Sequence, residues 1–430
     1  MTAARPALDW RASRPTAVVL LAALIFGLWL FTPAWQNERG ADFRDLYAAA
    51  SLSSHGGDPY DPSQQFAEED RLFKAAGVGS THATYGYPPL FTAVVRTALP
   101  LGEPAAYALF AALLALAGAV GFELLLIALD RRRRRLARAF FLTSTPMVLS
   151  LLVGNPSPVL LLAMAAAMWL MRRRRALLAG LVLSVCLLKL PVGLPAAVAI
   201  ILASPWLRAR LGLGFAAGTA GWVLLDIALS GPGPFGRWLG SLLGYGAALS
   251  PHTSSAFSQS GLAGLPALFL DHLPLAVSVA LALVPVAAVA VYVWSAGGLM
   301  ADSPHEPWLA AALLLVMLVG LSPYLHLNDL VLLAFPLLVV AGARPRIIGS
   351  LALLDFSVGA PLRLLAVVAL VATVGYRPAA SYAGSGISIV VLSLLAVALV
   401  ARRRPDPGAA AEAAGNDAYR SPARVASDRK

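Results

Sequence analysis

Two acidic residues, Asp42 and Asp45, stand three positions apart in the segment ADFRDLYAAA. If this segment is helical, the two carboxylates lie one turn apart on the same face. One of them could then act as a general base while the other positions a substrate hydroxyl. The structural alternative is that both are solvated acids at the start of a short helix, where negative charge is favoured.

Asp42 is the stronger candidate because it follows a hydrophobic run by only a few residues. A carboxylate at the edge of an apolar environment is costly to bury, and such groups concentrate at functional sites. The polar segment that it opens extends to residue 91 and contains the turn signals GGDPYDP and YGYPPLF. Because proline and glycine favour sharp turns, an architectural role is the simplest explanation for these two motifs.

Other candidate side chains each have a structural explanation beside a functional one. Lys189, one of three lysines, could bind a phosphate or extend toward lipid headgroups. Asn155, in VGNPSP, could hydrogen-bond a sugar or cap a helix. His326, beside Asn328 and Asp329, is either a functional group or an ordinary satisfied histidine. Three further residues are candidates for substrate contacts: Tyr87, Arg96 and Gln259.

Several chemistries are not supported by the sequence. The six histidines lack the spacing of a metal site, and the single cysteine, Cys186, cannot form an internal disulfide. Neither a G-x-x-x-x-G-K-S/T phosphate loop nor a G-x-S-x-G element occurs. We therefore expect no metal site, no cofactor, no ATP-driven transport and no serine hydrolase of that type.

The segments that must position these residues are hydrophobic. Of the 430 residues, 59% are hydrophobic and 13% are charged, whereas a soluble protein carries about 25% charged residues. The composition predicts an integral membrane protein. The net charge of +11 does not indicate nucleic-acid binding, because the arginines cluster at the ends of hydrophobic runs, as the positive-inside rule describes. These clusters are 131–135, 172–175, 208 and 210, 344 and 346, and 402–404.

If every arginine cluster is cytoplasmic, the chain alternates consistently through about twelve spans, with Asp42 on the outer side. Spans at 104–129 and 156–171 are examples. Several spans are shorter than the roughly 20 residues that a perpendicular helix needs, and paired short segments meet at Gly154-Asn155-Pro156 and at Lys189-Leu190-Pro191. Short helices that meet at sheltered polar turns predict an outward-facing cavity below the membrane surface.

The expected organisation is a cytoplasmic N-terminus (1–15), a transmembrane domain (16–401) and a disordered cytoplasmic tail (402–430). The transmembrane domain would contain a first outer loop with juxtamembrane helices (36–103) and a second outer loop (231–273). The predicted fold class is an all-α polytopic membrane protein with several short or broken helices.

Taken in order, several motifs resemble glycosyltransferase family 87, the polyprenol-phosphate-mannose-dependent α-(1→2)-mannosyltransferases of the GT-C membrane class. ADFRDLYAAA, GGDPYD and YGYPPLF resemble the family's opening signature. VGNPSPVLLLAMA resembles its Gly-Gln/Asn turn, and AGLVLSVCLLKLPVGL its lysine-proline segment. SQSGLAG and LSPYLHLNDLVLL resemble two later blocks, so the resemblance extends from about residue 17 to residue 401.

The resemblance implies a GT-C-type fold that moves a hexose, mannose in this family, from a polyprenyl-phosphate donor to a hydroxyl of a glycolipid or glycan acceptor. The transfer would invert the anomeric centre at the outer face of the cytoplasmic membrane, with a carboxylate of the first outer loop as base. Asp42 is the matching position. SQS at 258–260 departs from the family, in which an asparagine is expected before the glutamine, and this leaves the acceptor contacts of Gln259 open.

This chemistry needs no nucleotide, because a lipid phosphate is already an activated leaving group. Lys189 and His326 are the groups expected to stabilise the departing phosphate. The alternative is a secondary transporter or lipid-linked sugar flippase, since transporters also contain broken spans and buried charges. The polar candidates gather near one face and no internal repeat relates two halves, which favours glycosyl transfer.

Overall fold

The structure is a computed structural model that describes residues 39–74, 85–128, 141–142, 144–202, 204, 207–248, 326–336 and 338. Every regular element within these ranges is a helix, which agrees with the predicted all-α class. The predicted first span, the 402–430 tail, Gln259 and most of the second outer loop lie outside the described residues, and so do many of the spans expected after residue 248.

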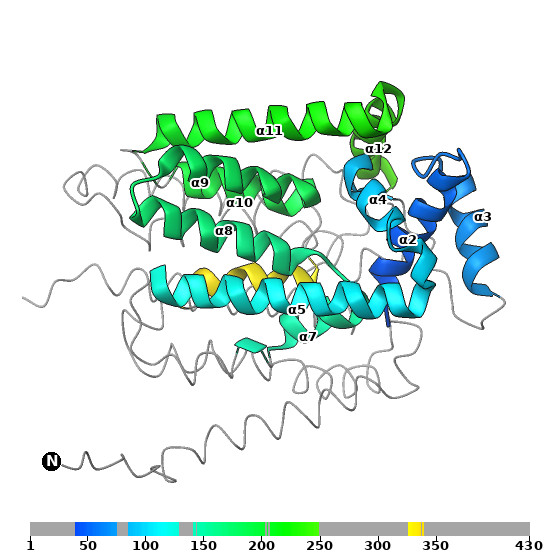
Figure 1. The fold of residues 1–430 in the computed structure, drawn as a ribbon, viewed down its shortest axis with the longest axis horizontal. Coiled ribbons are helices and arrows are strands. Elements are labelled where there is room, and N and C mark those ends of the chain that lie inside the picture. Colours follow the sequence, from blue (N-terminus) through cyan, green and yellow to red (C-terminus); the bar gives the residue numbers. More distant parts are fainter. Residues whose placement is uncertain are drawn as a thin grey trace, which may run out of the picture.

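Five helices form a bundle of roughly parallel rods (Figure 1). They are α5 (Glu103–Ala128), α8 (Ser157–Arg172), α9 (Ala176–Leu183), α10 (Leu190–Leu202) and α11 (Arg208–Ser230). In the described part of the chain, three helical runs are long and apolar enough to cross a membrane: Glu103–Ile127, Ala176–Leu202 and Arg208–Ser230. Large aliphatic side chains are exposed on the bundle surface, such as Leu113 and Leu224, as expected for helices that face lipid.

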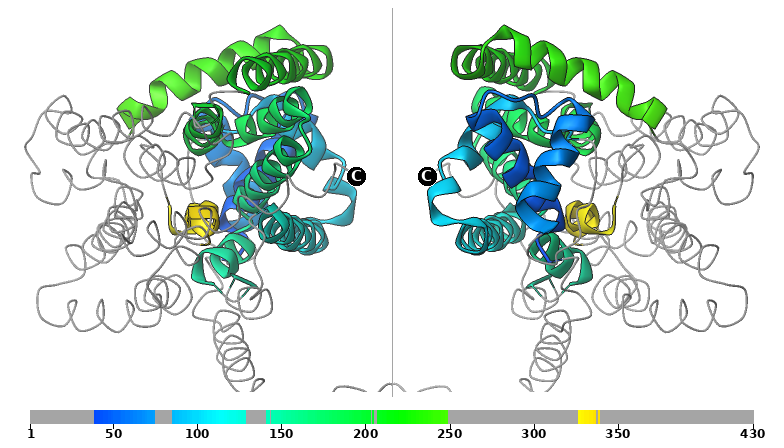
Figure 2. Two further views of the ribbon diagram at one scale, coloured as in Figure 1. Left: turned by 90° about the vertical axis from the view of Figure 1, so that its left-hand side faces the viewer. Right: turned by 90° about the vertical axis from the view of Figure 1, so that its right-hand side faces the viewer.

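The shorter helices gather at one end of this bundle (Figures 1 and 2). This end carries α2 (Ala41–Ser54), α3 (Pro62–Phe73), α4 (Pro89–Arg96), η3 (Leu99–Leu101) and α12 (Pro232–Ala248). The opposite end carries arginines, because α8 ends at Arg172 and α11 begins at Arg208. Nη1 of Arg172 donates a hydrogen bond of 2.7 Å to the carbonyl of Ile127, near the end of α5. The arginine ends of α8 and α11 and the short helices therefore lie at opposite ends of the bundle.

The chain reverses direction between η4 (Ser184–Lys189) and α10. A Cβ added to Gly193 would lie 1.7 Å from the carbonyl oxygen of Cys186, although a straight helix separates residues seven positions apart by about 10 Å. The helical run Ala176–Leu202 therefore doubles back instead of crossing the bundle once, and Lys189 lies at the reversal. This agrees with the predicted meeting of two short segments at Lys189-Leu190-Pro191.

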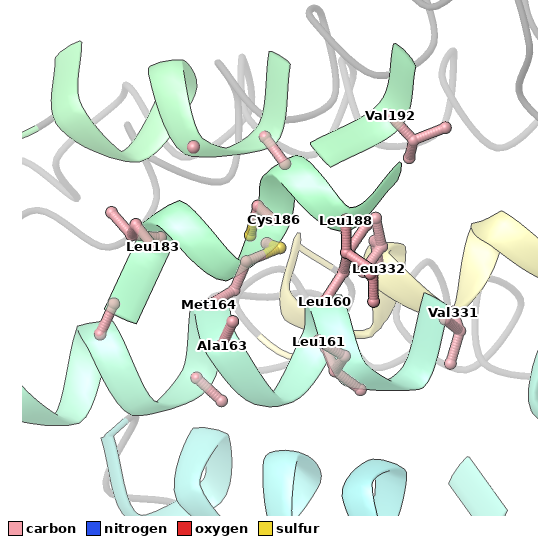
Figure 3. Close-up of a cluster of buried hydrophobic side chains, with 14 of the residues drawn as sticks. Leu160, Leu161, Ala163, Met164, Leu183, Cys186, Leu188, Val192, Val331 and Leu332 are labelled. Atoms are coloured by element: carbon pink, nitrogen blue, oxygen red, sulfur yellow. The ribbon is translucent and has the colours of Figure 1, made fainter. Parts of the chain in front are cut away.

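A buried apolar cluster holds η8 (Leu327–Leu333) against the bundle (Figure 3). Val331 and Leu332 of η8 pack among side chains of α8 and η4, and both are fully buried. Close packing of this kind leaves little freedom for the residues that begin η8. Asn328 and Asp329 are thereby held beside the N-terminal end of α8.

Small residues allow α9 and α11 to approach closely. A Cβ added to Gly214 would lie 2.1 Å from the carbonyl oxygen of Leu177, and one added to Gly180 would lie 2.1 Å from that of Leu211. Helices in a membrane associate through such close backbone contacts, because lipid offers apolar side chains no hydrophobic gain from pairing. The glycines are therefore structural residues of this helix pair.

We expect Gly214→Ala to destabilise the protein by about 1–3 kcal/mol, because the added methyl group forces α9 and α11 apart. Gly212→Ala is the matched control on the same helix, since nothing lies within 4 Å of the added Cβ. Because alanine has a higher helix propensity than glycine, this control variant should be as stable as the wild type or more stable by up to about 1 kcal/mol. Thermal unfolding in nanodiscs compares the two variants, and equal midpoints would contradict this packing.

Candidate functional site

Asp42 lies in the first turn of α2, where the backbone is fixed against the turn between α7 (Thr145–Val153) and α8. The Gly40 N–H donates a 2.7 Å hydrogen bond to the carbonyl of Leu152. Gly154 has a φ of 75°, and a Cβ there would lie 2.6 Å from the Cβ of Phe43. Only glycine combines this left-handed conformation with so close an approach. The Gly-Asn-Pro turn therefore places Asn155 beside Asp42.

Asn155 is buried and uses both ends of its amide. Its Nδ2 donates a hydrogen bond of 2.6 Å to Oδ2 of Asp42. Its Oδ1 accepts a 3.0 Å hydrogen bond from the backbone N–H of Ser157 at the start of α8. The side chain therefore serves the start of α8 and also contacts the candidate base, while its hydrogen bond to a sugar stays a prediction. The second contact fixes the orientation of the amide.

A second amide approaches the same carboxylate oxygen. Nδ2 of Asn328 lies 3.5 Å from Oδ2 of Asp42. The carbonyl of Asn328 is held in turn by the Ser150 hydroxyl at 2.9 Å. Among the described residues, both hydrogen bonds to the Asp42 side chain are made to Oδ2 and none to Oδ1. The carboxylate is therefore oriented through one oxygen while the other is left for a further partner.

Lys189 forms an ion pair with Asp329. Its Nζ lies 2.5 Å from Oδ1 of Asp329, whose side chain is fully buried, whereas the lysine side chain is 12% exposed. The Ser157 hydroxyl contacts the same oxygen of Asp329, and the backbone N–H of His326 donates to Oδ2 at 3.1 Å. Asp329 therefore joins the reversal at Lys189, the start of α8 and the start of η8.

The structure thus brings together four of the predicted residues: Asp42, Asn155, Lys189 and His326. They come from α2, the turn before α8, η4 and the residue before η8, and the contacts above connect them through Ser157, Asn328 and Asp329. We refer to these seven residues as the Asp42 cluster. The described residues contain no group of three or more His, Cys, Asp or Glu that could hold a metal ion.

Asp45 lies one turn along α2 and, like Asp42, is half-buried. Its backbone carbonyl accepts a 3.1 Å hydrogen bond from Nε2 of Gln65. Burial raises the pKa of the Tyr85 hydroxyl above its ordinary value, and the nearby charge of Asp45 raises it further. The Asp45 carboxylate therefore lies near Tyr85, at the turn before α4.

Two further candidates lie on the 85–91 segment and α4. Tyr87 is half-buried, and its ring lies 5.8 Å from that of Tyr85 and 5.5 Å from that of Phe91. Arg96 is exposed in the last turn of α4. Gln259 lies outside the described residues. These positions stay predictions as substrate contacts.

α3 holds the far end of α2. Oγ of Ser51 donates a 2.6 Å hydrogen bond to Oε1 of Glu68, and Arg71 forms an ion pair with the same carboxylate at 2.6 Å. Hydrogen bonds from Arg71 hold the pKa of Glu68 below its ordinary value, although burial opposes this. The ionised form of Glu68 is therefore the one that the fold stabilises.

We expect Glu68→Gln to lower the thermal midpoint near pH 7 more than it does in acid. Because the folded pKa of Glu68 is lowered, its contribution to stability is present above the ordinary carboxyl pKa of about 4.3 and is lost as the pH falls through the lowered value. Midpoints of both proteins measured from pH 7 down to about pH 3 check this. A difference that grows in acid would contradict it.

Sequence reasoning mentioned Asn328 and Asp329 only as neighbours of His326, and it did not single out Ser157. The available signal was local, since polar residues interrupt apolar runs in VGNPSP and HLNDL. What it could not reveal is that these two interruptions meet, 172 positions apart, at Ser157 and Asp329.

The family of this chain can be identified by comparison with known proteins. The model of glycosyltransferase family 87 matches residues 85–325, which is more than half of the chain. The matched range includes Asn155 and Lys189. Asp42 and His326 lie outside it, but Asp42 is hydrogen-bonded to Asn155, and both His326 and Lys189 contact Asp329. No curated protein matches the chain. The chain therefore belongs to glycosyltransferase family 87, and it is a membrane protein that acts as a glycosyltransferase.

Proposed function

We propose that this enzyme transfers a hexose, and specifically mannose, from a polyprenyl-phosphate donor to a hydroxyl of a glycolipid or glycan acceptor. The reaction takes place at the outer face of the cytoplasmic membrane, with inversion at the anomeric carbon. The observation that carries the proposal is the contact of Asp42 with Asn155 and Asn328, at the bundle end opposite the arginine ends of α8 and α11.

Asp42 acts as the general base in this proposal. Two amides orient its Oδ2, so Oδ1 can accept the proton of the acceptor hydroxyl as that oxygen attacks the anomeric carbon. The new bond joins the acceptor oxygen to the anomeric carbon, and the bond from that carbon to the phosphate oxygen breaks. The polyprenyl phosphate departs with the bonding electrons, and a single displacement of this kind inverts the centre.

The departing phosphate is stabilised by Lys189 and His326. One of the three ammonium hydrogens of Lys189 is directed to Asp329, and an ammonium group can donate further hydrogen bonds. The ion pair with Asp329 offsets the cost of burying Lys189 before the donor binds. The other candidates, Asp45, Tyr87, Arg96 and Gln259, are assigned to contacts with the sugar or the acceptor.

The charge distribution supports the proposed orientation of the protein. Under the positive-inside rule, arginine-rich helix ends favour the cytoplasmic side, which supports an outer position for the Asp42 cluster at the opposite end of the bundle. A site near this end could admit a polar acceptor from water and a lipid-linked donor from the bilayer. Family membership favours this enzyme over a transporter or flippase, which would move the lipid-linked sugar intact.

The proposal is tested with purified protein in nanodiscs, radiolabelled polyprenyl-phosphate mannose and candidate glycolipid acceptors. We expect label to move from the donor to the acceptor, and to do so faster than from the corresponding glucose and galactose donors. An intact sugar–phosphate bond with every acceptor would contradict glycosyl transfer from this donor class. Faster transfer from another hexose donor would correct the sugar alone.

A further inference from the structure

Tyr107 lies in the second turn of α5, where that helix passes α2 and α7 (Figure 1). Its hydroxyl lies 2.7 Å from the carbonyl oxygen of Leu152 and 3.0 Å from that of Leu151, so its single hydrogen is shared between the two. Both carbonyls belong to the last turn of α7, where a helix has no further N–H groups of its own to offer them. Tyr107 therefore supplies, from another helix, the donor that the end of α7 lacks.

The same tyrosine contacts the start of α2. The carbonyl of Leu152, to which its hydroxyl donates, also accepts a 2.7 Å hydrogen bond from the Gly40 N–H. A Cβ added to Gly40 would lie 3.4 Å from the Tyr107 ring, and that ring lies 5.8 Å from the ring of Phe43. Because Gly40 and Phe43 lie on either side of Asp42 in the chain, these contacts hold the first turn of α2 around the candidate base.

The amide that orients the base rests on the same end of α7. The Asn155 N–H donates a 2.8 Å hydrogen bond to the carbonyl of Ser150, in the last turn of that helix. Nδ2 of Asn155 then lies 2.6 Å from Oδ2 of Asp42. The end of α7 therefore supports the amide through Ser150 and the helix of the base through Gly40, and Tyr107 binds this end between the two.

We propose that Tyr107 is a positioning residue for sugar transfer, which fixes the first turn of α2 on the end of α7 and so holds the Asp42 carboxylate against the Asn155 amide. Catalytic groups must be held within about 0.5 Å of their productive geometry, and the 2.6 Å contact of these two side chains depends on how α2 lies on α7. Tyr107 acts through the backbone and needs no contact with substrate. This inference rests on the proposed function for its rate measurements only.

The test variant is Tyr107→Phe, which removes the hydroxyl and keeps the ring. The first measurement is hydrogen exchange in nanodiscs without substrate, followed in a peptide that covers residues 36–46 and so reports the Gly40 N–H. We expect exchange about tenfold faster than in the wild type, the factor that one ordinary hydrogen bond contributes to a local opening. Tyr47→Phe is the matched control, because the Tyr47 hydroxyl donates instead to the carbonyl of Leu99 in η3, at 3.3 Å. It should leave exchange in this peptide unchanged.

The second measurement is kcat for transfer per folded molecule. We expect a loss of about tenfold in Tyr107→Phe, because small displacements of a catalytic group slow a reaction strongly. The donor and acceptor KM values should change little, and kcat of Tyr47→Phe should stay within about twofold of the wild type. Adding Tyr107→Phe to Asp42→Asn should lower the remaining rate by less than about twofold, because the base that Tyr107 positions is already absent.

Three results would overturn the inference. They are unchanged exchange of the peptide in Tyr107→Phe, a kcat equal to that of the wild type in that variant, and the same fold loss from Tyr107→Phe in Asp42→Asn as in the wild type. The last result would show that Tyr107 affects the rate independently of the base. If the wild-type enzyme transfers no sugar from any polyprenyl-phosphate donor, the proposed function fails. The exchange measurement still decides whether Tyr107 fixes α2 on the end of α7.

Discussion

Replacing Asp42 with asparagine is expected to lower kcat for sugar transfer by about two to four orders of magnitude, the usual contribution of a general base. The substitution removes the proton acceptor and changes the shape of the side chain very little. An amide oxygen at this position can still accept the hydrogen bond from Nδ2 of Asn155, which lies 2.6 Å from the carboxylate in the wild type. The fold and the thermal midpoint should therefore be preserved. Single-turnover transfer with radiolabelled donor measures the effect.

The matched control for this variant is Asp45→Asn, one turn along the same helix. Asp45 lies near Tyr85, whereas the amides of Asn155 and Asn328 are hydrogen-bonded to Asp42. Because Asp45 is assigned to a contact with the sugar or the acceptor, its replacement should raise the KM of the donor or of the acceptor more than it lowers kcat. Asp42→Asn turnover within tenfold of wild type would remove Asp42 from the role of base. A larger loss of kcat in Asp45→Asn than in Asp42→Asn would move that role to Asp45.

Replacing Lys189 with methionine is expected to destabilise the protein by about 3–5 kcal/mol, because it leaves the charge of Asp329 buried without its partner. The side chain of Asp329 is fully buried, and methionine offers it no hydrogen bond in place of the ammonium group. Asp329→Asn in the same protein should recover most of the stability, since a neutral amide removes the uncompensated charge. The Ser157 hydroxyl can still bond to the amide oxygen. Thermal unfolding of both single variants and the double variant completes a double-mutant cycle.

The double variant also separates the structural role of Lys189 from its proposed contact with the donor phosphate. It should fold well and yet show a raised donor KM and a lowered kcat, while the acceptor KM stays near that of the wild type. A donor KM and a kcat equal to those of the wild type in the double variant would exclude Lys189 from phosphate binding. A Lys189→Met protein as stable as wild type would contradict the importance of its ion pair with Asp329.

The long helices could be predicted closely from the sequence. The spans expected at 104–129 and 156–171 correspond to α5 (Glu103–Ala128) and α8 (Ser157–Arg172). Each is an apolar run with proline at its start, and α8 has arginine at its end, and these are reliable signals of helix boundaries in a membrane. The reversal at Lys189 was also predictable, because proline and lysine interrupt two segments too short to cross a bilayer alone.

The contacts within the Asp42 cluster could not be predicted in the same way. Asn155 and Asp42 are 113 positions apart, and Asn328 and Asp42 are 286 apart. No local pattern encodes such pairings, because they depend on how whole helices pack.

The anomeric configuration of the product tests the central claim most directly. Wild-type enzyme in nanodiscs is supplied with a polyprenyl-phosphate mannose of defined anomeric configuration, and the glycosidic linkage formed is assigned by proton NMR. One displacement assisted by one base, Asp42, predicts a product of opposite configuration to the donor. Retention of the donor's configuration would contradict the account, because it requires either a covalent intermediate or attack from the side of the leaving phosphate.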